Sequence, residues 1–159
     1  MYRIGFSRDI HRLEKNGRRF ILGGVNIPFE FGNVSHSDGD CLYHAIAESL
    51  LGALSLGDLG QFFPDNDDKY LDLDSSFIVK ECFKKIKEKG YLVNNIDTVV
   101  VLEKPHLQKY LRQMEINISQ LLEINIDQVC VKVQTNEKCG EVGSNKAIIC
   151  FSNVLLRKE

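Results

Sequence analysis

The first 44 residues hold three of the four histidines of the chain, and an aspartate stands where it could join two of them in binding a metal. Asp9 and His11 are two positions apart in a segment, Arg3 to Leu13, that is predicted to be a strand, so their side chains leave the same face. His44 lies in a predicted helix. One oxygen and two nitrogen donors leave the fourth position of a catalytic zinc open. Spacing alone favours a plainer interpretation, in which Asp9 and His11 cap a strand end and His44 is a hydrogen-bonded core residue.

A second polar group, His-Ser-Asp-Gly-Asp at 36–40, lies at the N-terminus of the same predicted helix. The N-terminus of a helix attracts anions through its free N–H groups and its dipole, and His36 and Ser37 would add donors. A phosphate site is one interpretation of this group. The alternative is an ordinary capped turn with a solvated acidic pair.

Two other segments contain residues that could bind a substrate. The segment 56–68 is rich in turn-forming residues and acids, which could hold hydroxyl groups or a hard cation. Its aspartates are Asp58, Asp65, Asp67 and Asp68. Gln134–Lys138 follows a predicted strand, and ligand-binding groups gather at strand ends in α/β sheets. Thr135 and Glu137 could there serve a phosphate and its metal. A solvated turn explains most of the acidic charges of 56–68 equally well.

The composition limits the class of protein. A chain of 159 residues, 43% hydrophobic and 26% charged, fits one domain with a sizeable core. Its 20 basic and 22 acidic residues give a net charge of -2, which argues against nucleic acid as a partner. No segment approaches the ~18 consecutive apolar residues of a membrane span. The first residues carry no basic-then-apolar leader, so we expect no secretion signal.

The cysteines do not form a recognisable pattern. They are Cys41, Cys82, Cys130, Cys139 and Cys150. An odd number without a Cys-x-x-Cys pair argues against a cysteine-rich zinc site or a disulfide framework, and favours a reducing compartment. Each lies among apolar or small residues, so we expect buried thiols.

Hydrophobic periodicity predicts the elements of the first half. After the strand at 3–13, Phe20–Ile27 is predicted to be a second strand with a bulge or bend at its glycine pair. A helix is predicted over 38–54, with Ser37 or Asp38 as its N-cap. Its apolar stripe consists of Leu42, Ala45, Ile46, Leu50 and Leu54. The segment 56–68 is predicted to be a loop.

The second half alternates helices and strands. A helix is predicted from about Asp74 to Gly90, a strand over 97–102, a helix over 107–121, and strands over 129–133 and 147–156. The residues that the first of these helices turns inward are Ile78, Val79, Cys82, Phe83 and Ile86. This order predicts an α/β or α+β fold with helices packed on a sheet, and one domain over residues 1–159.

Several motifs occur together in an order and spacing that are specific. They are Asp9-Ile10-His11-Arg12, Ile21-Leu22-Gly23-Gly24-Val25, His36-Ser37-Asp38-Gly39-Asp40 with His44, and Leu56-Gly57-Asp58-Leu59-Gly60 through Phe63-Pro64-Asp65. This series resembles the 2-C-methyl-D-erythritol 2,4-cyclodiphosphate synthase family of the non-mevalonate isoprenoid route. The resemblance covers essentially the whole chain. It favours functional roles for His11, His36 and His44 over the plainer interpretations.

The resemblance implies an assembly and its metals. The fold would be a single layer of helices on a mixed sheet, in a homotrimer whose sheets face the three-fold axis and whose active sites lie between subunits. Asp9, His11 and His44 would ligate zinc. Glu137 would hold a second ion, magnesium or manganese, on the diphosphate, while His36 and Thr135 would position the diphosphate and stabilise the transition state.

The resemblance also implies which residues contact the substrate. Asp58 and the turn at 63–65 would hold the methylerythritol hydroxyls, and 102–108 would surround the cytidine, largely through backbone atoms. The implied set is Asp9, Ile10, His11, His36, Ser37, Asp58, Leu59, Gly60, Phe63, Pro64, Asp65, Asn66, Asp67, Leu102, Glu103, Lys104, Pro105, His106, Leu107, Gln108, Gln134, Thr135, Asn136 and Glu137.

The implied reaction is that of a metal-dependent phosphorus–oxygen lyase. The substrate, 4-diphosphocytidyl-2-C-methyl-D-erythritol 2-phosphate, would cyclise when its 2-phosphate attacks its own β-phosphorus and CMP leaves. Such a reaction needs positioning and charge neutralisation rather than a protein nucleophile. We expect no nucleic-acid or membrane partner. The expected location is the cytoplasm for a bacterial chain, or an organelle stroma for a trimmed eukaryotic one.

The chain departs from the family pattern at three places. Phe6-Ser7-Arg8 follows Gly5 where the family usually has Gly-His-Gly-Phe, His106 stands where a lysine is common, and Ser144 stands in place of the usual arginine. The last change argues against an isoprenoid diphosphate on the trimer axis. Two other functions stay open: a catalytically silent zinc-binding trimer, and a zinc phosphodiesterase in which water attacks.

Overall fold

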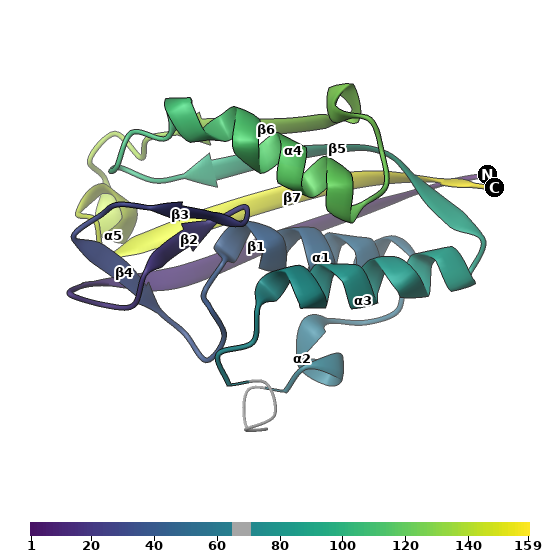
Figure 1. Ribbon diagram of the computed structural model, residues 1–159, viewed down its shortest axis with the longest axis horizontal. Helices are drawn as coiled ribbons and strands as arrows, with labels where there is room; N and C mark the ends of the chain where they lie inside the picture. Colours follow the sequence, from purple (N-terminus) through teal and green to yellow (C-terminus); the bar gives the residue numbers. More distant parts are fainter. Residues whose placement is uncertain (65–70) are drawn as a thin grey trace.

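The computed structural model describes residues 1–64 and 71–159, and its centre is a five-stranded mixed sheet (Figure 1). The strands lie in the order β4-β1-β7-β5-β6. They are β1 (Tyr2–Lys15), β4 (Phe31–Val34), β5 (Tyr91–Val101), β6 (Val129–Gln134) and β7 (Ala147–Lys158). β5 and β6 are parallel, and the other neighbours are antiparallel. The predicted combination of helices with a mixed sheet is therefore confirmed.

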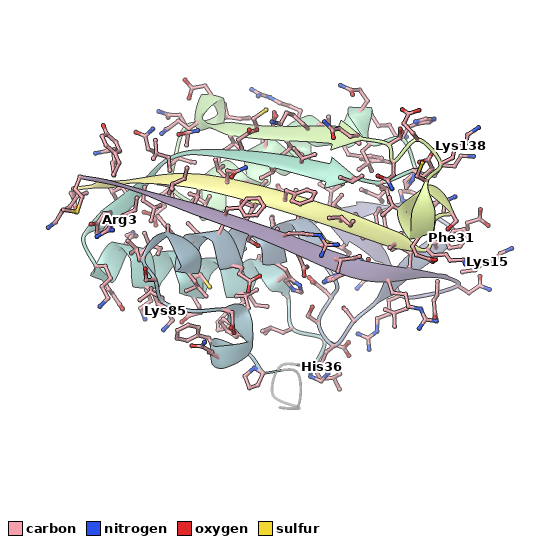
Figure 2. The ribbon with its side chains drawn as sticks, turned by 180° about the vertical axis from the view of Figure 1, so that it is seen from behind. Arg3, Lys15, Phe31, His36, Lys85 and Lys138 are labelled. Carbon is pink, nitrogen blue, oxygen red and sulfur yellow. The ribbon has the colours of Figure 1, made fainter. Side chains whose placement is uncertain are left out.

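Three helices pack on one face of this sheet (Figure 1). They are α1 (Cys41–Ala53), α3 (Ser75–Glu88) and α4 (Leu111–Leu121). Four shorter helical turns complete the described chain: α2 (Leu59–Phe62), α5 (Gly140–Gly143), and the 3-10 turns η2 (Gln108–Tyr110) and η3 (Ile126–Gln128). Seen from behind, the sheet carries no helical layer on its other face among the residues that the structure describes (Figure 2). None of the described helices is long and apolar enough to cross a membrane.

The helix α1 lies close against β1, because the strand has a glycine without a Cβ atom at the point of contact. Gly5 of β1 is buried, and a Cβ atom added to it would lie 1.9 Å from the carbonyl oxygen of Ser49 and 2.9 Å from the amide nitrogen of Ala53, both in α1. A larger residue would push the helix outward. The predicted stripe of α1 is buried at Leu42, Ala45, Ile46 and Leu50 and half-buried at Leu54, which follows the helix.

The segment predicted as one strand over 20–27 is instead a hairpin. β2 (Phe20–Leu22) pairs with β3 (Val25–Ile27), and the two glycines between them form a tight turn. Gly23 and Gly24 both have positive φ, 55° and 72°, which the two central residues of a type I′ turn require. The glycine pair therefore reverses the chain, where a bulge or bend was predicted.

The helix predicted from 38 begins later, at Cys41. Its N-cap is Asp40, neither Ser37 nor Asp38, because the Asp40 carboxylate accepts the Tyr43 N–H at 3.0 Å. The same carboxylate accepts the N–H groups of Gly23 and Gly24 at 2.9 and 2.7 Å, so it joins the hairpin to the helix. These three hydrogen bonds hold Asp40 in the N-cap position more firmly than the single hydrogen bond of an ordinary cap would.

Further along the chain the predictions differ mainly at the ends of elements. α3 has Asp74 as its N-cap, ends before Gly90, and buries all five of the predicted residues. The described part of the predicted loop at 56–68 contains the short helix α2, which Asp58 caps by accepting the Gln61 N–H at 3.1 Å. The strand predicted over 97–102 is longer, and the helix predicted from Leu107 begins as η2.

All five cysteines are free thiols, but only Cys41, Cys82 and Cys150 are buried. Cys130 and Cys139 are exposed, so the prediction of buried thiols is wrong for these two. Cys130 lies on β6, where buried and exposed positions alternate, and its side chain falls on the exposed face. Cys139 precedes the surface helix α5.

Candidate metal centre and substrate site

Asp9, His11 and His44 meet where β1 faces the first turn of α1. Asp9 Oδ2 lies 2.9 Å from His11 Nε2 and 3.6 Å from His44 Nδ1, and the two ring nitrogens are 3.2 Å apart. Their side chains are 25%, 10% and 15% exposed in this order. Among the described residues, this is the one group of three or more His, Cys, Asp or Glu side chains that could hold a metal ion.

The strand and the helix bring the three side chains together. Asp9 and His11 alternate with the exposed Arg8 and Ile10 on β1, so both face the helices, as the predicted period requires. They lie in mid-strand, paired with Cys150 and Ile148 of β7, and so do not cap a strand end. The plainer interpretation of this pair is therefore wrong.

Each histidine keeps one nitrogen for a possible metal. His11 Nδ1 lies 2.8 Å from the Gly39 carbonyl oxygen, which can only accept, so Nδ1 carries the proton of the neutral ring and Nε2 is bare. His44 Nε2 faces hydroxyl groups, which leaves Nδ1 turned toward Asp9 and His11. Asp9 Oδ2 is buried without a well-aligned hydrogen bond among the described residues. A carboxylate oxygen and two ring nitrogens thus converge on one point, an arrangement that fits a bound cation.

The charges of this group support one another. Burial alone would raise the pKa of Asp9, but the imidazoles of His11 and His44 hold that pKa well below its usual range. Burial alone would lower the pKa of His11, yet the adjacent Asp9 carboxylate raises it above its usual value. Asp9 is therefore ionised at neutral pH and attracts positive charge into the group.

A cavity of about 400 Å³ opens beside the metal-binding group and contains several of the predicted substrate residues. These are Asp9, Ile10, His11, His36, Ser37, Leu59, Gly60 and Phe63. Asp58 does not line it, and its carboxylate caps α2 by accepting the Gln61 N–H. Asp65, Asn66 and Asp67 lie outside the described residues. The Asp40 carboxylate accepts the Tyr43 N–H of α1, so the predicted anion site at this helix start is occupied by the chain itself.

The cavity also contains a residue that the sequence did not identify. Glu48 lies one turn after His44 on α1, and its carboxylate is 3.5 Å from the Ser7 hydroxyl. Its i+4 spacing from His44 was a signal that it would share that face of the helix.

The other predicted residues gather at the carboxyl ends of β5 and β6. Leu102 donates its N–H to the Gln134 carbonyl at 3.0 Å, and the Glu103 carboxylate accepts the N–H of Asn136 at 3.2 Å. The Thr135 hydroxyl lies 3.3 Å from the Glu137 carboxylate. These contacts join the segments 102–108 and 134–137 into one cluster, at the strand ends where the sequence placed it. Leu102 and Leu107 are buried in it, and Thr135 and Glu137 are exposed.

The two groups of predicted residues do not meet within one chain. No residue of 102–108 or 134–137 belongs to the described lining of the cavity at the metal-binding group. β7 lies between β1 and β5 in the sheet, and Figure 2 shows His36 far from Lys138, which follows Glu137. The Lys104–Pro105 peptide in the second group is cis, and His106 beside it is exposed.

The fold and the site define a mixed α/β protein with an Asp-His-His group suited to a metal ion. The chain belongs to the YgbB family, whose sequence profile matches residues 2–157. A relative named 2-C-methyl-D-erythritol 2,4-cyclodiphosphate synthase, from Carboxydothermus hydrogenoformans, is 43% identical over 158 residues, which cover 99% of this chain and 96% of the relative.

Solved structures agree with this membership. The IspF protein of Plasmodium falciparum, solved as a CDP complex, superposes with a TM-score of 0.88 at 37% identity, covering 99% of this chain and 97% of that one. The bifunctional IspDF protein of Campylobacter jejuni superposes with a TM-score of 0.95 at 33% identity. This chain is covered completely there and corresponds to 43% of the bifunctional chain.

Proposed function

We propose that this chain converts 4-diphosphocytidyl-2-C-methyl-D-erythritol 2-phosphate into 2-C-methyl-D-erythritol 2,4-cyclodiphosphate and CMP, in the non-mevalonate isoprenoid route. The observation that carries the proposal is the Asp9-His11-His44 group, in a chain that matches a synthase of this name along almost its whole length. The CDP complex of the Plasmodium relative supports a cytidine nucleotide as part of the substrate.

Asp9, His11 and His44 would hold zinc, since one carboxylate oxygen and two imidazole nitrogens are ligands that zinc accepts. The bound ion would polarise a phosphate oxygen through the position that these ligands leave open. The exposed carboxylate of Glu137 suits a harder ion, magnesium or manganese, on the diphosphate.

The reaction balances without a protein nucleophile. A bond forms between a 2-phosphate oxygen and the β-phosphorus, and the bond from the β-phosphorus to the bridging oxygen breaks, so CMP leaves with that oxygen. The enzyme is thus a phosphorus–oxygen lyase. His36 and Ser37 in the cavity would orient the β-phosphate, and Thr135 would stabilise the charge that develops on it.

The active site would be complete only between subunits. Three observations support a homotrimer whose sheets face the three-fold axis: the bare sheet face, the separation of the two groups of site residues, and the exposed apolar side chains on β1. One subunit would supply the metal-binding group, and its neighbour the segments 102–108 and 134–137. An exposed apolar face of this kind is typical of a protein interface.

Incubation of the protein with the substrate and divalent metal, followed by phosphorus NMR, tests the activity. The expected products are the cyclic diphosphate and CMP. A linear methylerythritol diphosphate would instead indicate a phosphodiesterase in which water attacks. Zinc-loaded trimers that release no CMP would indicate a silent binding protein. Either of these results would overturn the proposal.

A further inference from the structure

The side of His44 that faces away from the metal-binding group is held by a buried serine. His44 Nε2 lies 2.9 Å from the hydroxyl of Ser75, the first residue of α3, and 3.2 Å from the hydroxyl of Ser37. Ser75 is completely buried. It contacts His44 from a different element, 31 positions along the chain, so the contact joins α3 to α1.

The carboxylate of Asp38 fixes the orientation of that serine. The Ser75 hydroxyl makes a short hydrogen bond to one carboxylate oxygen of Asp38, and the Ser75 backbone N–H donates to the other at 3.1 Å. The Asp38 N–H in turn donates to the Leu73 carbonyl at 3.2 Å. The Asp38 carboxylate is therefore bonded to Ser75, while the Asp38 N–H is bonded to the chain just before α3.

The direction of these hydrogen bonds determines the state of His44. The Ser75 hydroxyl donates its hydrogen to the Asp38 carboxylate and so turns a lone pair toward His44. The arrangement that suits this lone pair, on the nearer of the two hydroxyls, has the ring proton on His44 Nε2, which donates it to Ser75. His44 Nδ1 is left without a proton, facing Asp9 and His11.

We propose that Asp38 and Ser75 are positioning residues that hold His44 in the tautomer and orientation that a metal ion requires. The inference rests on the proposed metal at Asp9, His11 and His44. Metal-binding histidines commonly donate their second N–H to a carboxylate or carbonyl, and such partners fix both tautomer and ring direction. Here a serine hydroxyl stands between the histidine and the carboxylate.

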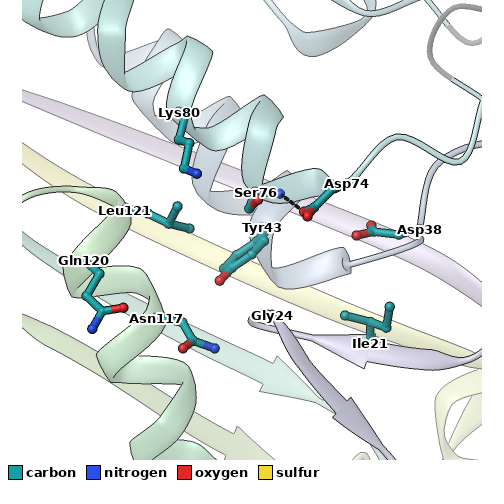
Figure 3. Close-up of a pocket in the computed structure, with 10 residues that line it drawn as sticks. All are labelled: Ile21, Gly24, Asp38, Tyr43, Asp74, Ser76, Lys80, Asn117, Gln120 and Leu121. Atoms are coloured by element: carbon teal, nitrogen blue, oxygen red, sulfur yellow. Dashed lines mark hydrogen bonds between the residues drawn. The ribbon is translucent and has the colours of Figure 1, made fainter.

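Asp38 is also the place where this chain of hydrogen bonds reaches another surface of the protein. It lines a separate cavity of about 510 Å³ between the hairpin, α3 and α4, together with Tyr43, Asp74 and Lys80 (Figure 3). In this cavity the Ser76 backbone N–H donates to the Asp74 carboxylate at 2.8 Å, and neither residue belongs to the described lining of the cavity at the metal-binding group. Ser76 is thus a matched control for Ser75, because it is the next residue of the same helix.

The test compares zinc retention in Ser75→Ala and Ser76→Ala. Zinc-loaded proteins are challenged with a chromophoric chelator, and circular dichroism checks that each variant is folded. We expect Ser75→Ala to bind zinc about 10- to 100-fold more weakly, the loss typical of such partners, and Ser76→Ala to match the unmodified protein. Ser75→Thr, which keeps a hydroxyl, should regain most of the affinity. Equal zinc affinity in the two alanine variants would overturn the proposal.

Nitrogen-15 NMR of the histidine rings gives a second readout that does not depend on activity. In the metal-free, unmodified protein at alkaline pH, His44 should carry its proton on Nε2, and Asp38→Asn should shift the tautomer population. A proton on Nδ1 in the unmodified protein would overturn the proposal even if Ser75→Ala failed to fold. An unmodified protein that binds no zinc, with His44 in the expected tautomer, would count against the proposed function alone.

Discussion

The contact between Asp9 and His11 makes the stability of the metal-free protein depend on pH. The raised pKa of His11 means that this contact stabilises the fold fully below the pKa of an unfolded histidine, about 6.5, and that the stabilisation fades as pH rises through the folded value. The lowered pKa of Asp9 keeps its charge in place throughout this range. Zinc binding has the opposite pH dependence. It is favoured as pH rises, because a histidine must lose its proton before it can bind the ion.

Asp9→Asn, which keeps the size of the side chain, isolates this effect. In the absence of metal, we expect the difference in free energy of unfolding between the unmodified protein and Asp9→Asn to be larger near pH 5.5 than near pH 9. Urea unfolding at both pH values measures it. A difference that does not change with pH would mean that the ion pair contributes nothing to stability.

His36 and Thr135 should affect the rate of the proposed reaction more than substrate binding. Both are proposed to act on charge that develops during transfer, and such interactions lower kcat more than they raise KM. We expect His36→Ala and Thr135→Ala each to lose on the order of 10²-fold in kcat. Thr135→Ser keeps the hydroxyl and serves as the control. Steady-state kinetics that show a raised KM at normal kcat would make both of them simple binding residues.

At the scale of elements, the close approach of α1 to β1 sets the distance between His44 on the helix and Asp9 and His11 on the strand. Gly5→Ala would place a Cβ 1.9 Å from a carbonyl oxygen of α1 and displace the helix. Overpacking of this kind costs about 1–3 kcal/mol. We expect this loss in urea unfolding, together with weaker zinc binding.

Gly52→Ala is a control for this prediction in the same helix. Outside its own helix backbone, a Cβ at Gly52 would have the Phe6 carbonyl oxygen as its nearest neighbour, at 3.9 Å, so the space is free. The change should leave zinc binding intact and raise stability by up to about 1 kcal/mol, because alanine favours a helix. If Gly5→Ala bound zinc as tightly as Gly52→Ala, the position of α1 would not control the metal site.

The elements that periodicity defines well were predicted from the sequence. The inward residues of α3 follow one stripe of about 3.6-residue period, and β1 shows strand alternation around Asp9 and His11. The predictions are wrong where contacts between residues that are distant in the sequence determine the local structure. Asp40 caps α1 because its carboxylate also accepts two N–H groups from the β2–β3 hairpin, and no local pattern shows that.

The candidate site was predictable in its parts but not in its geometry. The spacing of Asp9 and His11 placed both on one face, and residue types already offered His44 as a third ligand. The resemblance favoured that role over the plainer interpretation. Ser75 falls within the helix predicted from about Asp74, and its contact with His44 depends on how α3 packs, which the sequence does not show. The separation of Thr135 and Glu137 from the metal-binding group follows from the strand order, which spacing along a chain does not specify.

At the scale of the whole molecule, the proposed trimer predicts that two inactive variants restore each other. His11→Ala removes a ligand in one half of the site, and Thr135→Ala changes the other half. Unfolding the two variants together and refolding them should give mixed trimers in which some sites combine two intact halves, so part of the activity returns. Mixed trimers that stay inactive would place both residues in the site of a single subunit.

The exposed apolar side chains of β1 have a consequence for how stability should be measured. Tyr2, Ile4, Phe6 and Ile10 are 66%, 74%, 63% and 47% exposed in the single chain. If neighbouring copies cover them, folding is coupled to association, and the law of mass action applies to the melting temperature. Calorimetry should then show a Tm that rises as the protein is concentrated, and dilution alone should destabilise a fold whose own contacts have not changed.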